Sequence, residues 1–114
     1  MSKTIFDKII SKEIPSDIIY ENDEFLAFND ISPQAPVHVL VIPKKRISTI
    51  NHMEEKDALM VGKMIFIAKN IAKSLEIDED GYRLVFNCNE YGGQTVYHIH
   101  LHLLGGRRFN WPPG

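Results

Sequence analysis

Cysteine is nearly absent from this chain of 114 residues, and it has neither long hydrophobic runs nor a marked excess of one charge. Its single cysteine, Cys88, can form neither an intramolecular disulfide nor a cysteine-based zinc cluster. No window approaches the roughly 20 apolar residues of a transmembrane helix. The formal net charge of -2 argues against a nucleic-acid polymer as the main partner. We therefore expect no membrane partner and a reducing location, in the cytoplasm or in both cytoplasm and nucleus.

The residues that are present indicate an ordinary globular protein. Hydrophobic residues make up 44% of the chain, charged residues 25% and aromatic residues 10%, which excludes a disordered polypeptide. No repeat or linker divides the sequence, and a chain of this length supplies one hydrophobic core. We predict a single domain over residues 1–114.

The hydrophobic pattern predicts about five strands and one main helix. Strands are expected at 18–21, 24–28, 37–42, 82–87 and 96–104. A short N-terminal helix is expected to begin at Thr4 or Ser2, and the segment 88–95 to be a polar loop. The long helix is expected between Asn51 or Met53 and Leu75. Its apolar stripe comprises Val61, Met64, Ile65, Ala68, Ile71, Ala72 and Leu75, widened by Met60 and Ile67. This is an α+β fold with an antiparallel, meander-like sheet.

Three of the five histidines, at positions 98, 100 and 102, alternate with aliphatic residues. Because side chains alternate between the faces of a strand, a strand here places the three imidazoles on one face. The rise of about 3.3 Å per residue separates neighbouring histidines of the row by some 6 to 7 Å. The row is therefore the best candidate for a functional site.

Three interpretations of this row differ in chemistry. A metal ion would need His38 as a third ligand, and the flanking loops offer only Glu90 as a carboxylate. Solvent-facing side chains account for one histidine more easily than for three. A neutral imidazole can instead attack phosphorus while its neighbours donate hydrogen bonds to the anion. The preceding Gly92 and Gly93 allow main-chain N–H groups to approach phosphate, and Thr95 adds a hydroxyl donor, so we favour phosphoryl chemistry.

The segment His98–Leu104 resembles the histidine triad signature, in which three histidines alternate with apolar residues. The similarity extends to the Hint branch of that family through 5–10, 12–15, 30–36, 38–44, 92–97, 105–107 and 111–114. It implies a histidine triad fold with a five-stranded antiparallel sheet, one long helix and one short helix. It also implies metal-independent hydrolysis of purine nucleoside 5'-phosphoramidates, such as AMP amides or acyl-adenylates, through a covalent nucleotidyl-histidine and without a cofactor.

The resemblance also implies a role for individual residues. His100 would be the nucleophile, His102 would stabilise the phosphoryl oxygens, His98 would support the row, and Thr95 would lie near the leaving amine. The implied nucleotide-binding residues are Asp30, Ile31, Phe6, Ile9, Ile14, Phe28, His38, Leu40, Asn87, Gly93, Gln94 and Trp111.

Two further expectations come from the same resemblance. Two chains would pair into a homodimer with a continuous ten-stranded sheet, in which Trp111 reaches toward the active site of the partner. Some relatives hold a structural zinc through N-terminal cysteines, which this sequence lacks, so no metal is expected. Three alternatives stay open: a dinucleoside polyphosphate hydrolase, a nucleotide-binding scaffold or sensor with negligible turnover, and a metal-dependent hydrolase.

Overall fold

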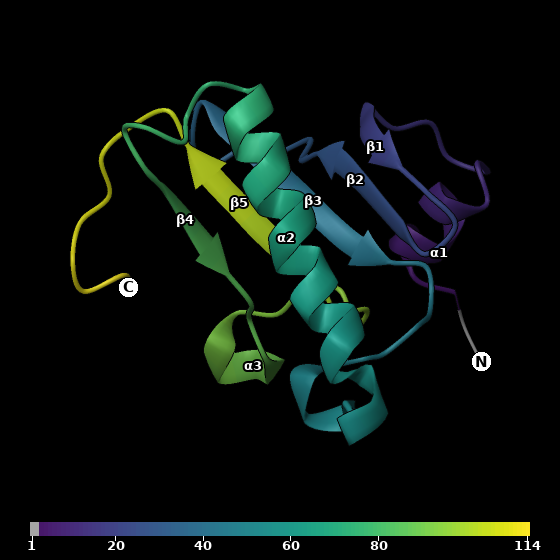
Figure 1. The fold of residues 1–114 in the computed structure, drawn as a ribbon. Helices are drawn as coiled ribbons and strands as arrows, with labels where there is room; N and C mark the ends of the chain where they lie inside the picture. The colour runs from purple at the N-terminus through teal and green to yellow at the C-terminus, as the bar shows by residue number, and fades with distance from the viewer. Residues whose placement is uncertain (1–2) are drawn as a thin grey trace.

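The computed structural model describes residues 3–114, so the suggested cap at Ser2 lies outside the described part. It contains three α-helices, two 3-10 turns and five strands (Figure 1). The helices are α1 (Ile5–Ile10), α2 (Ala58–Ser74) and α3 (Asn89–Gly92), and the 3-10 turns are Ile50–His52 and Glu55–Asp57. The strands are β1 (Ile18–Glu21), β2 (Phe25–Asn29), β3 (Val37–Pro43), β4 (Tyr82–Val85) and β5 (Leu101–Gly105).

All five strands form one antiparallel sheet in the order β1-β2-β3-β5-β4. The predicted α+β class and five-stranded sheet are thereby confirmed. The expected meander-like order is wrong beyond β3, because β5 inserts between β3 and β4. The chain leaves β3, runs along α2 across one face of the sheet and returns at the edge strand β4 (Figure 1). This crossover leaves the position beside the central strand β3 to the last strand, β5.

The sheet is covered on both faces, which explains why β3 is an almost continuous apolar run. One core lies between the sheet and α2 and includes Val39, Val41, Leu101 and Leu103 with Met64, Ala68, Ile71 and Ala72. A second, smaller core lies on the opposite face, where Phe6 and Ile9 of α1 pack against Leu26, Phe28, Leu40 and Ile42. Leu40 pairs with His102 in the β3–β5 register. The histidine row therefore shares a face with α1 and not with α2.

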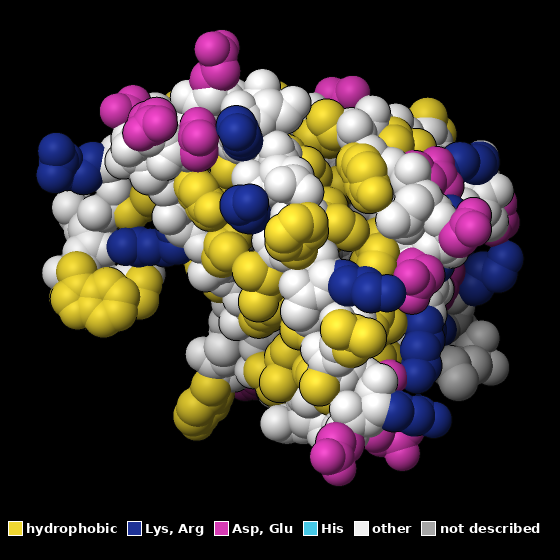
Figure 2. Space-filling view, viewed as in Figure 1, with side chains coloured by type: hydrophobic (Ala, Val, Ile, Leu, Met, Phe, Trp, Pro, Cys, Tyr) yellow, Lys and Arg dark blue, Asp and Glu magenta, His cyan; other side chains and the backbone are white. Residues whose placement is uncertain are grey.

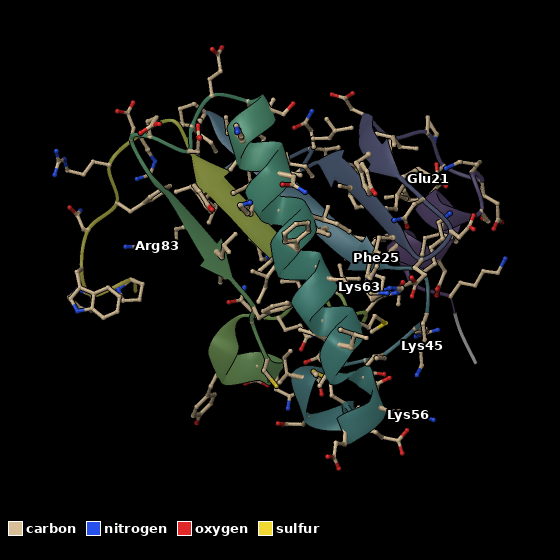
Figure 3. All side chains as sticks on the ribbon, in the orientation of Figure 1. Glu21, Phe25, Lys45, Lys56, Lys63 and Arg83 are labelled. Atoms are coloured by element: carbon tan, nitrogen blue, oxygen red, sulfur yellow. The ribbon has the colours of Figure 1, made fainter. Side chains whose placement is uncertain are left out.

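The long helix begins later than the sequence predicts, at Ala58. Residues 50–57 form the two 3-10 turns instead, and the carboxylate of Asp57 accepts a hydrogen bond from the main-chain N–H of Glu54 at 2.9 Å. Lys45, which follows β3, lies near this end of α2 (Figure 3) and forms an ion pair with Asp57 at 2.7 Å. These polar contacts stabilise the turns and delay the start of the helix.

The strand that carries the histidines is also shorter than predicted. β5 begins at Leu101, so His98 and His100 precede the strand. The main-chain N–H of Ile99 donates to the carbonyl of Ile47 at 2.8 Å, outside the sheet's ladder. Similarly, β4 ends at Val85, β2 is shifted by one residue, and α3 replaces part of the expected polar loop.

Hydrophobic side chains gather over the outward surface of α2 and on the projecting C-terminal tail (Figure 2). Leu59, Phe66 and Trp111 are 72%, 60% and 82% exposed, respectively. Ile65 and Leu75 are exposed although the predicted stripe includes them. None of the described helices combines the length and apolar character needed to span a membrane.

Candidate active site

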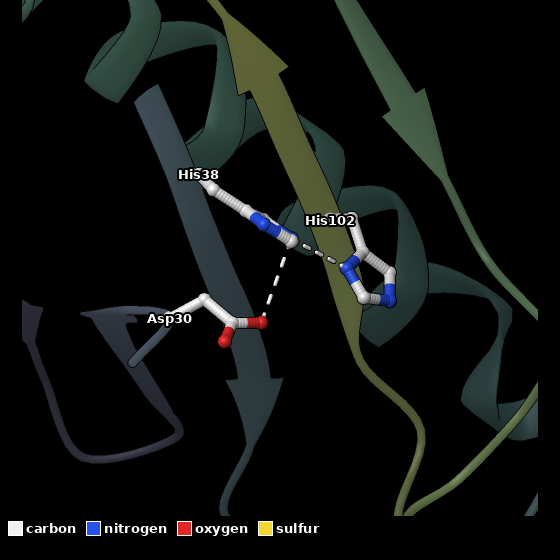
Figure 4. Close-up of side chains that lie close together, drawn as sticks. All are labelled: Asp30, His38 and His102. Carbon is white, nitrogen blue, oxygen red and sulfur yellow. Dashed lines mark hydrogen bonds and ion pairs between the residues drawn. The ribbon is translucent and has the colours of Figure 1, made fainter. Parts of the chain in front are cut away.

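His102 belongs to a chain of hydrogen bonds that begins at the main chain of the loop before β3. The N–H of Gln34 donates to Nδ1 of His38 at 3.0 Å, which leaves the proton of neutral His38 on Nε2. That Nε2 lies 2.9 Å from Nδ1 of His102 and 3.6 Å from a carboxylate oxygen of Asp30 (Figure 4). His38 therefore donates to His102, and the proton of neutral His102 lies on Nε2. This nitrogen is buried without a hydrogen-bond partner among the described residues.

The other two imidazoles are fixed by main-chain carbonyls. Nδ1 of His100 lies 2.8 Å from the carbonyl oxygen of His98, and Nε2 of His98 lies 2.7 Å from that of Pro43. A carbonyl only accepts, so each of these ring nitrogens carries the proton. His100 therefore presents an unprotonated Nε2, whereas the unprotonated nitrogen of His98 is Nδ1.

Burial keeps all four imidazoles in the uncharged form. It is the largest cause that lowers the pKa of His38, His98 and His100 below the ordinary 6.5. Burial, reinforced by the neighbouring His100 and His38, lowers the pKa of His102 to about 4. At neutral pH the row is an uncharged set of nucleophiles and donors.

The rings are closer together than strand geometry predicts. The ring centroids of His100 and His102 are 4.9 Å apart, because His100 lies just before the strand. The ring of Phe6 meets His100 edge-on at 4.9 Å and His98 at 5.9 Å. Helix α1 therefore covers His98 and His100 on this face of the sheet.

One group of described side chains could hold a metal ion. Ligand atoms of Asp30, His38 and His102 all lie within 4.8 Å of one another. This differs from the arrangement considered from the sequence, since the carboxylate is Asp30 and not Glu90. The hydrogen bond between the two imidazoles occupies one nitrogen of each ring. A metal would have to replace that bond.

The structure brings most of the expected residues to one face of the sheet. The three histidines, His38 and Asp30 lie beside the apolar cluster formed by Phe6, Ile9, Phe28 and Leu40, against which Ile14 packs. Ile31 and Trp111 project into solvent and are 91% and 82% exposed. Neither side chain is buried against the site within the single chain, so their contacts with a nucleotide stay predictions.

The loop before the histidines is braced by Gln94. Its buried side chain accepts from the N–H of Asn89 at 2.9 Å and donates to the carbonyls of Ser48 and Val96 at 2.8 and 3.0 Å. Gly93 ends α3 with a φ of 83°, which favours glycine. Asn87 is half-buried and Thr95 is exposed nearby in the sequence. The side chain of Gln94 thus orders this loop, and its main-chain N–H donates to the carbonyl of Asn89 at 3.0 Å, so its contact with a nucleotide stays a prediction.

Sequence reasoning missed four groups that orient the row. Two are main-chain groups, the N–H of Gln34 and the carbonyl of Pro43, and no sequence pattern identifies them. The others are Asp7, 3.8 Å from Nδ1 of His98, and Arg46, 3.2 Å from Asp7. The spacing of Thr4 and Asp7 fits a capping box, so a carboxylate at the start of α1 could have been found.

A sheet that carries linked, neutral imidazoles beside an apolar cluster has the groups that hydrolysis with a histidine nucleophile requires. The chain belongs to the HIT domain family, whose model matches residues 11–109. It is 56% identical over 105 residues to a protein of Escherichia coli named purine nucleoside phosphoramidase, covering 92% of this chain and 88% of that one. It is 53% identical over 115 residues to a 14 kDa zinc-binding protein of Zea mays, covering 99% and 89%. A HIT family hydrolase of Legionella pneumophila superposes with a TM-score of 0.96 at 52% identity, covering 98% of this chain and 100% of that one.

Proposed function

We propose that this protein hydrolyses the P–N bond of purine nucleoside 5'-phosphoramidates, with His100 as the nucleophile. The observation that carries the proposal is the hydrogen bond between Nδ1 of His100 and the carbonyl of His98. It leaves Nε2 as a free base at neutral pH, and a neutral imidazole is an effective nucleophile. The name of the relative in Escherichia coli supports the substrate class.

The reaction takes two steps. Nε2 of His100 attacks the α-phosphorus and forms an N–P bond while the bond to the amine breaks, and the amine takes up a proton from solvent as it leaves. Water then attacks the phosphorus, its proton is released, and AMP leaves while His100 is restored. Nε2–H of His102 donates to a non-bridging oxygen in both steps, where negative charge must be stabilised.

The surroundings of the row suit a purine nucleotide. The cluster of Phe6, Ile9, Phe28 and Leu40 offers an apolar surface for the base. Asp30 lies next to His38, with one carboxylate oxygen 3.6 Å from Nε2 of that ring. The other carboxylate oxygen accepts from the N–H of Ser32 at 2.8 Å. We assign Asp30 to the ribose hydroxyls. Thr95 is assigned to the leaving amine, and Asn87 and Gly93 to the phosphate. The N–H of Gly93 donates to the carbonyl of Glu90 at 3.0 Å, so a bond from it to phosphate would have to replace that one.

A single substitution tests the nucleophile. We expect His100→Ala to lower kcat for adenosine 5'-phosphoramidate by more than about a thousandfold, because no other group takes over the covalent step. Wild-type enzyme quenched in acid during turnover should carry one nucleotidyl group on residue 100, detected by mass spectrometry. His52→Ala, which removes an exposed histidine outside the row, should keep full activity. Full turnover by His100→Ala would refute the mechanism.

The same assay separates the alternatives. A scaffold or sensor would bind AMP but turn over too slowly for a nucleotidyl adduct to accumulate. A dinucleoside polyphosphate hydrolase would prefer Ap3A or Ap4A over the phosphoramidate in kcat/KM. A metal-dependent hydrolase would lose activity with EDTA. We expect the chelator to leave kcat unchanged, because the proposed chemistry uses only the imidazoles.

A further inference from the structure

A carboxylate and a guanidinium meet next to the buried end of the histidine row. Asp7 belongs to the first turn of α1, where its carboxylate accepts from the main-chain N–H of Thr4 at 2.8 Å. The same oxygen lies 3.2 Å from Nη1 of Arg46, which follows β3. Both side chains are mostly shielded, with exposures of 21% and 28%. The pair ties the start of α1 to the segment after the central strand.

The second oxygen of Asp7 faces an imidazole whose charge matters for the proposed reaction. It lies 3.8 Å from Nδ1 of His98, a fully buried ring. Within residues 3–114 this nitrogen has no hydrogen-bond partner, and Nε2 already donates to Pro43. A proton on Nδ1 would turn the approach to Asp7 into a buried ion pair. The arrangement is therefore stable in its neutral form only while the carboxylate is compensated from elsewhere.

We propose that Arg46 is a positioning residue for the reaction at His100. Its ion pair with Asp7 compensates the negative charge of the carboxylate. The carboxylate then neither stabilises a proton on Nδ1 of His98 nor pulls the ring of His98 toward α1. The proposal rests on the function proposed above. His98 supplies the carbonyl that holds Nδ1–H of His100, so displacement of His98 would misalign the nucleophile. A cationic His98 would also withdraw electron density from its neighbour.

The electrostatic causes at His98 agree with this arrangement. Asp7 raises the pKa of His98, Arg46 lowers it, and burial lowers it most. The charged or titratable groups that face His98 are Asp7 from α1, Arg46 from the segment after β3, and His100 from its own segment. Removal of Arg46 alone therefore leaves an uncompensated anion beside the ring. Removal of both charges restores the balance.

The test uses Arg46→Met, Arg46→Lys and the double variant Arg46→Met/Asp7→Asn. The pH profile of kcat for adenosine 5'-phosphoramidate is the readout. We expect Arg46→Met to move the acid limb upward by about one pH unit, the usual effect of one nearby charge. Arg46→Lys should retain the wild-type limb. The double variant should return to it, although it has lost two side chains that contact each other.

Lys45→Met is the matched control. Lys45 precedes Arg46 and also pairs with an aspartate of a capping box, Asp57, but that pair lies at the start of α2. Its loss should leave the acid limb unchanged. A role for Arg46 in stability alone would give no rescue by the second substitution, and an unmoved limb in Arg46→Met would overturn the proposal.

Nitrogen-15 NMR of the imidazoles separates this proposal from the proposed function. In wild-type protein, His98 should carry its proton on Nε2 and titrate below its ordinary pKa; in Arg46→Met the titration should move to higher pH. This result is independent of turnover. Absence of phosphoramidase activity with the expected NMR shift would refute only the function, whereas full activity without the shift would refute only the role of Arg46.

Discussion

Each imidazole of the row has its tautomer set by the main chain, and this shapes the role of every histidine. The carbonyls of His98 and Pro43 fix two rings, and the N–H of Gln34 fixes His38 and, through it, His102. Main-chain groups do not titrate, so these tautomers are insensitive to moderate changes of pH. The row therefore holds unprotonated nitrogens on His98 and His100 and a free donor on His102.

The same burial makes stability depend on pH. The folded-state pKa values of the four histidines lie below 6.5, whereas in the unfolded chain they return to about 6.5. The unfolded chain then binds more protons in mildly acidic solution, so stability is complete above about pH 6.5 and falls as the pH drops toward the folded-state values. For His102, with a pKa of about 4, the full loss is about 3 kcal/mol.

Urea unfolding at pH 7 and pH 5 measures this effect. We expect a lower free energy of unfolding at pH 5, with most carboxylates still ionised at both values. His102→Gln cannot titrate and should reduce the difference between the two. Equal stability of the wild-type protein at pH 7 and pH 5 would contradict the assignment of a neutral, buried row.

At the scale of elements, the sequence predicted which segments are strands better than it predicted their ends. β1 agrees with its expected range, and β2 and β3 differ from theirs by one residue. The triad was expected inside a strand, but the ladder starts only at Leu101 because Ile99 bonds to Ile47 of a distant segment. Hydrophobic alternation runs from 99 to 103, whereas the ladder begins only at 101, so the pattern predicted the correct face but placed the start of the strand too early.

The sequence likewise predicted some residues of the candidate site and missed others. Alternation and the family resemblance together identified the triad, His38 and Asp30. Asp7 and Arg46 were not identified, because their proximity depends on how α1 packs against the segment after β3. The insertion of β5 between β3 and β4 was also missed. Strand order is decided by tertiary pairing, about which local periodicity carries no information.

Replacement of a glycine by alanine is expected to lower stability at one position, Gly106, and to raise it at another, Gly62. Gly106, directly after β5, has a φ of +87°, and a Cβ there would lie 2.8 Å from the ring of Pro36. Gly106→Ala should therefore lower the free energy of unfolding by about 2 kcal/mol. Gly62 lies inside α2 with nothing within 4 Å of its Cβ position. Gly62→Ala should raise stability by about 1 kcal/mol.

Thermal and urea unfolding of the two variants provide this comparison. Each serves as the control for the other, because both add one methyl group to a glycine. A stabilised Gly106→Ala would show that the turn after β5 and the loop before β3 can separate at little cost. A destabilised Gly62→Ala would indicate that this part of α2 meets another surface in solution.

At the scale of the molecule, the isolated chain exposes more surface than its mass predicts. A monomer of 13.1 kDa has an accessible surface of about 6,400 Å², whereas this chain has 7324 Å². Trp111 of the tail is 82% exposed. A cavity of about 640 Å³ separates the tail from β4, lined by Phe86, Leu104 and Trp111 among others. The projecting tail and the hollow beside it are visible in Figure 2.

This shape agrees with the homodimer expected from the family resemblance. β4 is an edge strand, so a second chain could extend the sheet there. Arg83 of β4, labelled in Figure 3, donates to the carbonyl of Asn110 at 3.0 Å and keeps the tail along this edge. Sedimentation equilibrium should give twice the mass of one chain. A monomer at all micromolar concentrations would exclude the dimer.

Mixing two damaged variants tests whether Trp111 completes the active site of the partner. Trp111→Ala should lower kcat/KM, and His100→Ala should be inactive. In a mixed dimer, the chain that retains His100 receives Trp111 from the His100→Ala chain. Excess His100→Ala should therefore restore kcat/KM per Trp111→Ala chain, whereas excess of the double variant His100→Ala/Trp111→Ala should not. Equal activity in both mixtures would show that Trp111 does not act across the dimer, and that the working site is contained in one chain.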